Sequence, residues 1–376
     1  MTKKRVAIIG TNGIPARYGG YETLVENLVD QLGDKYQFIV YCSNIYKKHE
    51  RKNTYKTAKL KYLPLRANGW QSIFYDVITL FHAAICSNII LYLGPGAGFI
   101  IPIIKLLNKN IIVNHGGLNE WEREKYNSFQ RFISKSGHKY AGKFASDNIA
   151  DNILLKDSLK KTFGVNSTVI RYGGNHAIKE NIDEDLQKKY PFLKNEFFVS
   201  ISRAQIDNNL HVVLEAFQFL PAQTLVMIAN WSVSDYGINL KNKYKNKYPN
   251  IILLDAIYEP KEINAIRGNA KAYIHSHSFC GTSPSLVEAM YLGLPIFSFD
   301  VPTNRETTQH KAFFFKDSIE LRNLINSLKD QELINNGKLM KMIAEKEYTW
   351  SKISSKYAEL FNRYGITNFT GTHSYV

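Results

Sequence analysis

Short, continuously apolar segments alternate with amphipathic helical segments along the chain, and this alternation restricts the fold more than any other feature. Residues 5–10 (RVAIIG) are the first such segment, and a glycine-containing loop and a helical pattern from Tyr21 follow it. Strands buried on both faces have this composition in parallel sheets, where helices cover both sides. The same strand–loop–helix order restarts after residue 195. The sequence therefore predicts an α/β protein with two Rossmann-like open parallel-sheet domains.

The length and composition suit this division. The 376 residues are enough for two domains, and 44 % hydrophobic residues are enough for a core in each. We predict a first domain at 1–176, a polar linker at 177–195, a second domain at 196–350, and at 351–376 a last helix with a loose tail. No apolar run is long enough to span a bilayer, and the first residues lack a signal-peptide pattern. Three cysteines without framework spacing favour a reducing cytoplasm.

Positive charge is concentrated in the first half of the chain. The net charge is +15, and residues 1–180 carry 26 Lys and Arg against 13 Asp and Glu, whereas residues 181–376 carry 22 against 20. Such a surface can meet nucleic acid, an anionic membrane or an acidic substrate, or can simply be solvated. Tyr and Phe among the lysines can stack on bases or lie at a lipid headgroup boundary. Charge alone leaves these alternatives open.

The segment 275–306 has the features of a phosphate-binding turn at the start of a helix. Ser283 suits an N-cap and Pro284 the first helical position, so the turn formed by Gly281, Thr282 and Ser283 presents free N–H groups at the positive end of the helix. Glu288, one turn further, can accept hydrogen bonds from ribose hydroxyls. Taken singly, Gly281 and Glu288 are better explained by ordinary loop and helix roles. Together they predict a nucleotide-diphosphate site.

Glycines and polar residues at other strand ends are further candidates. Gly19 and Gly20 begin the first helix, where backbone can approach a ligand closely, or where a long loop simply needs glycine for its turns. The loop does not fit G-x-G-x-x-G, which argues against a simple NAD enzyme. His115 follows the predicted strand 110–114 and is a candidate substrate contact, although a histidine there is often structural.

The second domain supplies three more candidates. Arg203 stands at the carboxyl end of a predicted strand and is placed to meet the same phosphates as the glycine turn. The loop 255–259, which contains Tyr258, would line the same crevice and could hold a base. His275 and His277 share a strand face, but no further ligands stand at compatible spacing, so we expect packing and no metal site.

These features resemble the GT-B glycosyltransferases, in which two Rossmann-like domains face a central cleft, and more narrowly the family 4 retaining glycosyltransferases. In that family the position of Glu288 holds the donor ribose, and the position of Arg203 is the arginine of an Arg/Lys pair. The positions that match the family's donor-binding residues are Gly19, Gly20, Arg203, Gly281, Thr282, Ser283 and Glu288.

Two positions depart from the family pattern. Cys280 stands where the family usually has a glutamate, and Asn208 stands where it has the lysine of the pair. Catalytic detail therefore does not transfer as directly as the fold. The stretches GTNGIPARYGGYE, YGGNHA and GTSPSLVEAM, and the later NRE, resemble a narrower group, the bacterial rhamnosyltransferases of capsule and O-antigen assembly.

The resemblance implies a retaining glycosyltransferase that moves a sugar, with L-rhamnose from dTDP-rhamnose as the expected donor, onto a lipid-linked oligosaccharide. It would act at the inner face of the cytoplasmic membrane, with the basic first domain on anionic headgroups, without metal or another cofactor and without nucleic acid. The expected catalytic residues are His115, Arg203 and Glu288, and Asn208 and Tyr258 would join the donor site. Alternatives are a UDP- or GDP-sugar donor, a nucleotide-sugar 2-epimerase, and a non-enzymatic basic protein that binds nucleic acid.

Overall fold

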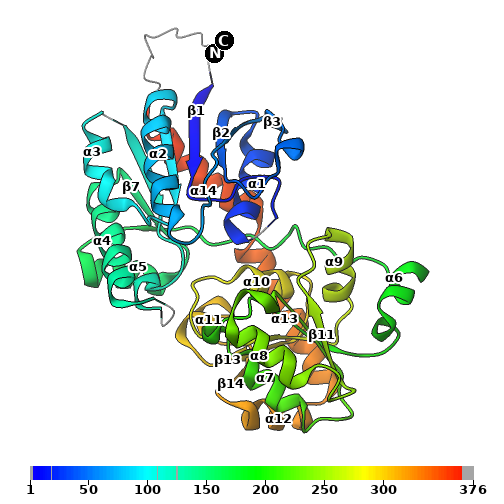
Figure 1. Cartoon of the computed structure of the whole chain (residues 1–376). Helices are drawn as coiled ribbons and strands as arrows, with labels where there is room; N and C mark the ends of the chain where they lie inside the picture. Colours follow the sequence, from blue (N-terminus) through cyan, green and yellow to red (C-terminus); the bar gives the residue numbers. More distant parts are fainter. Residues whose placement is uncertain (1–2, 18, 108, 124–125, 366–376) are drawn as a thin grey trace. The chain divides into compact units, whose positions relative to one another are not determined.

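The chain folds into two compact units, each built on one sheet. The structure is a computed structural model and describes residues 3–17, 19–107, 109–123 and 126–365. One unit comprises Met1–Ile170 and Ser351–Val376, and the other comprises Arg171–Trp350 (Figure 1). The division falls at residue 170 rather than at the predicted 176. The predicted linker 177–195 contains two short helices, α6 and η4, and belongs to the second unit.

The sheet of the first unit has eight strands in the order β3-β4-β2-β1-β5-β6-β7-β8. All neighbours pair parallel except β3 and β4. Residues Val6 to Ile9 of β1 are fully buried, as expected for a central parallel strand. The strands are β1 (Lys4–Ile9), β2 (Tyr36–Cys42), β3 (Thr54–Tyr55), β4 (Ala58–Tyr62), β5 (Ile89–Leu93), β6 (Asn110–Asn114), β7 (Asp147–Ala150) and β8 (Thr168–Val169).

Helices cover this sheet. Alternate strand residues, including Ala7, Ile9 and Tyr92, form one apolar cluster with side chains of α2, α3 and α4, so these three helices lie on the same face. The helices and short 3-10 turns are α1 (Gly20–Leu32), η1 (Lys48–Glu50), α2 (Gln71–Cys86), η2 (Gly98–Ile100), α3 (Ile101–Lys105), η3 (Glu120–Glu122), α4 (Ser128–Phe144) and α5 (Ile153–Phe163).

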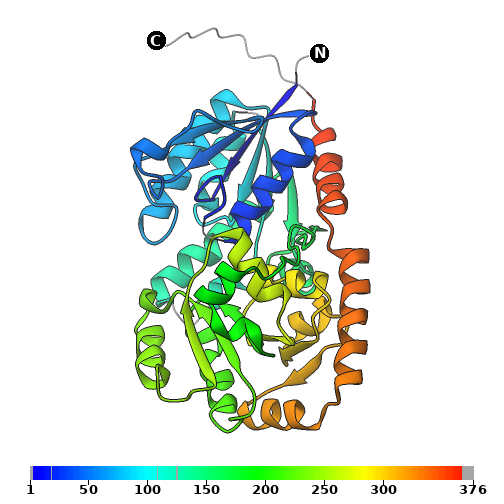
Figure 2. The same cartoon turned by 90° about the vertical axis from the view of Figure 1, so that its right-hand side faces the viewer.

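The last helix, α14 (Trp350–Asn362), starts in the second unit and continues in the first. Phe361 packs edge-on against the ring of Tyr36 on β2 at 5.3 Å between centroids, and Tyr357 accepts a hydrogen bond from Asn114 at 2.9 Å. Figure 2 shows this red helix beside the blue elements of the first unit. The segment predicted at 351–376 thus contributes its helical part to the first unit.

The sheet of the second unit has six parallel strands in the order β11-β10-β9-β12-β13-β14. Its strands are β9 (Phe198–Ser202), β10 (Leu225–Ala229), β11 (Ile251–Asp255), β12 (Ala272–His275), β13 (Ile296–Phe299) and β14 (Phe313–Phe315). Its helices are α6 (Glu184–Lys189), η4 (Pro191–Lys194), η5 (Ile206–Asn208), α7 (Leu210–Phe217), η6 (Trp231–Val233), α8 (Asp235–Tyr244), α9 (Pro260–Gly268), α10 (Pro284–Tyr291), α11 (Pro302–Thr307), α12 (Ser318–Ser327) and α13 (Asp330–Glu347).

The order in which strands are added to each sheet reverses at its central strand, β1 in the first unit and β9 in the second. In the second unit, β9 is followed by β10 on one side and has β12 on its other side. Ligands of open parallel sheets bind beyond the carboxyl ends of the strands at such a switch point. A ligand site is therefore expected at the loops after β9 and β12.

Candidate active site

The loop after β9 carries an arginine that is available to a ligand. Arg203 is exposed, and its guanidinium has no hydrogen bond or ion pair within the parts of the chain that the structure describes. Asn208 is buried, and its side-chain amide donates to the Arg203 carbonyl at 2.8 Å. Asn208, predicted as a donor contact, thus braces the backbone that carries Arg203.

The loops after β9 and β12 are held together by hydrogen bonds. The Ser276 hydroxyl donates to the Asn208 carbonyl at 2.6 Å, and the Asn209 amide donates to the Ser276 carbonyl at 3.1 Å. Both the backbone N–H and the hydroxyl of Ser278 donate to the Asp207 carbonyl, at 3.0 and 2.9 Å. The arginine loop and the segment that leads to the glycine turn therefore form one edge of the switch point.

The glycine turn precedes α10 as predicted. Ser283 occupies the N-cap position and Pro284 the first helical position. The Ser283 hydroxyl does not cap the helix but contacts the Ser285 hydroxyl at 3.3 Å. Gly281, Thr282 and Ser283 are all buried, so the turn packs into the second unit.

Glu288, one turn into α10, is the centre of a buried polar network. Its carboxylate pairs with the Arg267 guanidinium through one oxygen and contacts His176 Nε2 through the other at 3.0 Å. Arg267 also donates to the Asn264 side chain at 2.8 Å. Each oxygen thus has one partner already. A ribose would have to use the remaining lone pairs, a constraint that the prediction from sequence did not include.

The protonation of this network follows from its donors. The Trp350 indole N–H, which can only donate, lies 2.9 Å from His176 Nδ1, so that nitrogen accepts and Nε2 carries the proton given to Glu288. Burial alone would raise the pKa of the Glu288 carboxyl, but the Arg267 charge and the contact with His176 outweigh burial and lower the pKa. Glu288 is therefore a carboxylate at neutral pH.

The YGGNHA stretch and the NRE segment hold this region in place. A side chain at Gly174 would have its Cβ 2.6 Å from the Val287 carbonyl oxygen, so only glycine lets the backbone lie directly on α10. Asn304 donates to the carbonyls of His277 and Phe299, at 2.9 and 3.0 Å, and Glu306 pairs with Arg171. Both stretches thus support the turn and Glu288.

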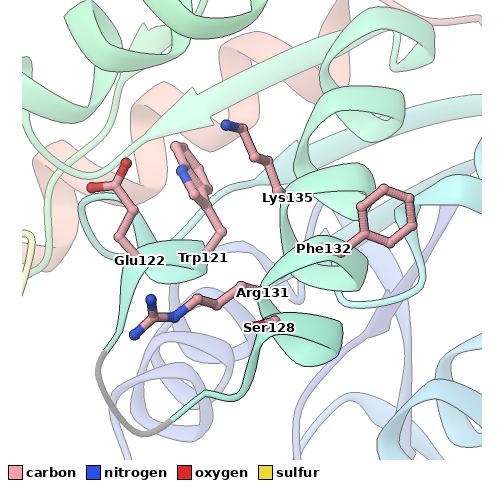
Figure 3. A pocket seen from close by; sticks show the side chains of 6 residues that line it. All are labelled: Trp121, Glu122, Ser128, Arg131, Phe132 and Lys135. Carbon is pink, nitrogen blue, oxygen red and sulfur yellow. The ribbon is translucent and has the colours of Figure 1, made fainter.

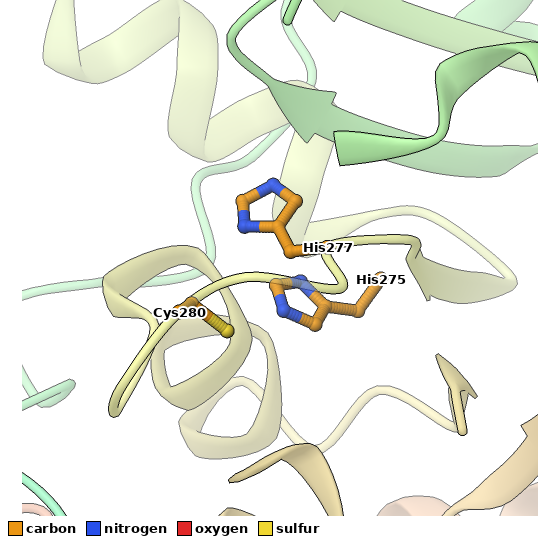
Figure 4. A group of neighbouring side chains, drawn as sticks. All are labelled: His275, His277 and Cys280. Atoms are coloured by element: carbon orange, nitrogen blue, oxygen red, sulfur yellow. The ribbon is translucent and has the colours of Figure 1, made fainter. Parts of the chain in front are cut away.

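Two imidazoles and a thiol gather beside the turn. The possible ligand atoms of His275, His277 and Cys280 lie within 4.8 Å of one another (Figure 4). His275 is fully buried, neither of its ring nitrogens has a hydrogen-bond partner, and burial lowers its pKa to about 3. Neutral histidine and the thiolate form of cysteine are ligands that zinc prefers, although tetrahedral bonds of about 2.0–2.3 Å would require these atoms to move closer together. Sequence spacing of the two histidines alone did not indicate this cluster, because the thiol comes from the next turn.

In the first unit, Tyr21 lies over the carboxyl ends of β5 and β6. A Cβ at Gly116 would collide with the Tyr21 hydroxyl, and a Cβ at Gly94 would lie 3.3 Å from the ring. Gly116 also has a φ of 71°, which favours glycine. Burial raises the pKa of the Tyr21 hydroxyl, which therefore stays protonated and able to donate. Sequence reasoning placed Tyr21 at the start of a helix but assigned it no role.

Gly19 and Gly20 occupy the predicted place at the start of α1. Gly19 is the N-cap, without a side-chain cap, and its φ of −167° is extended backbone that any residue adopts. The first-turn residue Glu22 is buried and accepts hydrogen bonds from the Thr11 hydroxyl at 3.0 Å and the Asn12 N–H at 2.8 Å. Glu22 thus closes the inside of the loop, and the exposed backbone at Gly19 is the part that a ligand can reach.

His115 does not have the predicted exposure to substrate. It follows β6 as expected, but its ring is fully buried, with Nδ1 3.1 Å from His138 Nδ1 and Nε2 2.9 Å from the Asn148 side-chain oxygen. Burial lowers the pKa of His115 to about 4. With both nitrogens engaged inside the unit, His115 is a structural residue, and its assignment as a catalytic residue is corrected.

Two hollows lie at the edges of the units. Tyr258 is 58 % exposed and lines a hollow with Asp255 and Glu259 after β11, where Asp255 pairs with Lys241 at 2.6 Å. In the first unit, a hollow at the start of α4 is lined by Trp121, Glu122, Ser128, Arg131, Phe132 and Lys135. In Figure 3, the side chains of Arg131 and Lys135 project from α4, and that of Glu122 from η3.

Solved structures with the same arrangement of elements define the fold. The chain superposes on HepE from Anabaena in complex with UDP with a TM-score of 0.71 at 16 % identity, covering 96 % of this chain and 100 % of that one. For sucrose-phosphate synthase from Thermosynechococcus elongatus the TM-score is 0.79 at 13 % identity, with 96 % and 99 % covered. For a putative UDP-N-acetylglucosamine 2-epimerase from Listeria monocytogenes it is 0.63 at 11 %, with 100 % of both covered. The protein has the GT-B fold, which confirms the predicted fold class.

Family comparisons then divide the chain. Residues 181–350 match the family of glycosyl transferases group 1, and residues 3–175 match a domain of unknown function, DUF1972. No curated protein matches the chain. The group 1 domain and the GT-B fold together support a glycosyltransferase.

Proposed function

We propose that the protein is a retaining glycosyltransferase that takes a sugar from a nucleotide diphosphate, with L-rhamnose from dTDP-rhamnose as the expected donor. The observation that carries this proposal is the switch point of the second unit, inside the group 1 domain, where the exposed Arg203 stands on a loop bonded to the segment before the glycine turn. A guanidinium and helix N–H groups are the donors that suit a diphosphate.

Catalysis in this proposal is electrostatic. When the bond between the sugar and the diphosphate breaks, the negative charge of the leaving diphosphate grows. Arg203 and the N–H groups at the start of α10 would stabilise that charge more strongly in the transition state than in the bound donor. Glu288, fixed by Arg267 and His176, would hold the ribose. His115 takes no part, because its ring is buried.

The acceptor is proposed to be a lipid-linked oligosaccharide that the protein meets at the inner face of the cytoplasmic membrane. The excess of Lys and Arg in residues 1–180 supports this, as does the hollow at the start of α4, where Arg131 and Lys135 could meet a pyrophosphate. Glu122 also borders that hollow and would disfavour an anion on its own side. None of the helices in the described residues is long and apolar enough to cross a membrane.

The donor proposal is tested by measuring the thermal stability of the full chain with dTDP, UDP, GDP, ADP and CDP. A nucleotide that binds only the native state stabilises it by about 2.7 kcal/mol at 100 times its Kd. We expect one of the five nucleotides, dTDP first, to stabilise the protein, and we expect this stabilisation to be smaller in Arg203→Gln.

No stabilisation by any nucleotide would contradict the donor site. Turnover of the nucleotide sugar without any acceptor would favour a 2-epimerase, and salt-sensitive DNA or RNA binding with no nucleotide effect would favour a nucleic-acid-binding protein.

A second expected result concerns metals. We expect sugar transfer to continue after the protein has been treated with EDTA, because the proposed charge stabilisation uses only Arg203 and backbone N–H groups. Activity that EDTA abolishes, that zinc restores, and that is missing in Cys280→Ser would show instead that His275, His277 and Cys280 hold a metal. Measured zinc content of the wild type and of Cys280→Ser gives a readout that does not depend on activity.

A further inference from the structure

The outward face of α2 is unusual because it is apolar. The exposed positions of this helix are Phe74, Ile78, Phe81, His82 and Ile85, and only His82 among them is polar. Trp70, directly before the helix, is 75 % exposed. Its ring lies edge-on to the ring of Phe74, with 6.3 Å between the ring centroids. A surface helix of a soluble domain normally has charged and polar residues on its outer face. This helix therefore lacks the usual water-facing side.

The apolar face continues over the neighbouring helices. Ile103 on α3 and the following Leu106 and Leu107 are exposed, as are Phe129 and Phe132 on α4. The helices α2, α3 and α4 pack on the same side of the sheet, and α3 contacts both α2 and α4 (Figure 1). Of the 24 large hydrophobic residues that are exposed in the described chain, 13 lie between residues 70 and 144. A patch of this kind marks an interaction surface.

The charges on these helices all have one sign at the surface. The sole acidic residue in the sequences of α2, α3 and α4 is Asp76, which is buried and accepts a hydrogen bond from Tyr92 at 2.6 Å. The exposed cations of α4 are Arg131, Lys135, Lys139 and Lys143, and they alternate with its exposed aromatic residues. Helices that lie in a membrane interface combine an apolar face, aromatic residues and Lys or Arg in this way.

From this combination we infer that the outer face of α2, α3 and α4, which we name the α2–α4 face, docks on an anionic lipid bilayer. The aromatic and aliphatic side chains enter the boundary between headgroups and acyl chains, and the cations of α4 meet the phosphates. A second copy of the chain is a poorer occupant. A twofold dimer through this face would bring the cations of two copies together, and none of the three helices carries an exposed acidic residue to pair with them.

The inference deepens the proposed function, since it assigns the membrane contact to particular residues. It rests on the proposed function only for the reason why the protein would bind a membrane, which is access to a lipid-linked acceptor. Binding to vesicles needs neither donor nor acceptor. A failure of vesicle binding is therefore distinguishable from a failure of the glycosyltransferase proposal, which the nucleotide measurements test.

The test is co-sedimentation of the full chain with vesicles of phosphatidylcholine alone and with 30 % phosphatidylglycerol, at low and high salt. We expect binding to the anionic vesicles that weakens in salt. The double variant Phe74→Ser/Ile78→Ser should bind the anionic vesicles at least about tenfold more weakly than the wild type, because two side chains no longer enter the interface. Each of Lys139→Gln and Lys143→Gln should lower binding about fivefold, on anionic vesicles only.

The chain offers a matched control. Phe219 and Ile334 of the second unit are 61 % and 50 % exposed, close to the 58 % and 50 % of Phe74 and Ile78. Phe219→Ser/Ile334→Ser should bind vesicles like the wild type. Equal binding by both double variants would overturn the inference. A second outcome would also overturn the inference: the wild type does not bind vesicles and forms a dimer, and Phe74→Ser/Ile78→Ser is monomeric. The face would then be the contact with a second copy of the chain. Circular dichroism and denaturant unfolding show that each variant is folded.

Discussion

Alanine at position 288 lowers the free energy of unfolding by about 3–5 kcal/mol, because it leaves a buried cation without its partner. The Arg267 side chain is 7 % exposed and pairs with Glu288, whose own side chain is 13 % exposed. His176 would lose its acceptor as well. Denaturant unfolding of wild type and Glu288→Ala measures this difference directly.

A double-mutant cycle separates the ion pair from simple loss of packing. Arg267→Leu in the Glu288→Ala background should restore part of the lost stability, because the buried charge is then removed. The control is Glu184, whose side chain is 91 % exposed and whose carboxylate oxygen lies 3.9 Å from Lys188 Nζ. Glu184→Ala should change the free energy of unfolding by less than about 0.5 kcal/mol. A change at Glu288→Ala as small as this control would show that the network is not formed. If the expected loss is found, nucleotide binding by variants at position 288 must be judged from the change in thermal stability between each variant with and without nucleotide.

Alanine in place of Arg203 lowers the rate of sugar transfer by about 10²–10³, while the free energy of unfolding stays close to that of the wild type. The loss of one preorganised donor to a developing negative charge has an effect of this size. Stability is preserved because the Arg203 guanidinium is exposed and has no partner in the described residues. Steady-state kinetics with the donor that the nucleotide panel identifies, together with denaturant unfolding, tests both halves of this statement.

Two further variants show whether the position matters as well as the charge. Arg203→Lys keeps the charge without the planar fork and should recover only part of the rate. Arg322→Ala removes an arginine on α12 that lies over Phe219, just beyond the end of α7, and should leave turnover unchanged. An Arg203→Ala enzyme as fast as Arg322→Ala would rule out the proposed role.

The fold was predictable because its pattern is local. Buried strands such as β1 are continuously apolar, and their helices have a clear period, so the order of elements and the restart after residue 195 follow from neighbouring residues. Strand β3 was less accessible. Thr54–Tyr55 lies in a lysine-rich connector without an apolar run, and its antiparallel pairing with Ala58–Tyr62 depends on a tight turn.

The site was predictable only where its residues are adjacent in the chain. Gly281 to Ser283 and Pro284 form one turn whose capping pattern is visible in the sequence. The partners of Glu288 are not: Arg267 comes from the end of α9 and His176 from the start of the second unit, and no motif links them. His115 shows the opposite problem. A strand end predicts proximity to the site, but whether a side chain points outward or into the core depends on packing that the sequence does not display.

The Glu288 network has a consequence for where this protein can be divided. The family matches end at residue 175 and restart at 181, yet Arg171, Gly174 and His176 pack in the second unit on Glu306, Val287 and Glu288. A chimera joined at the family boundary would take Arg171 and Gly174 from one parent and the residues that they contact, Glu306 and Val287, from the other. Exchange between related enzymes should therefore keep residues 171–350 together as one cassette, with the second junction after Trp350, whose indole belongs to the same network.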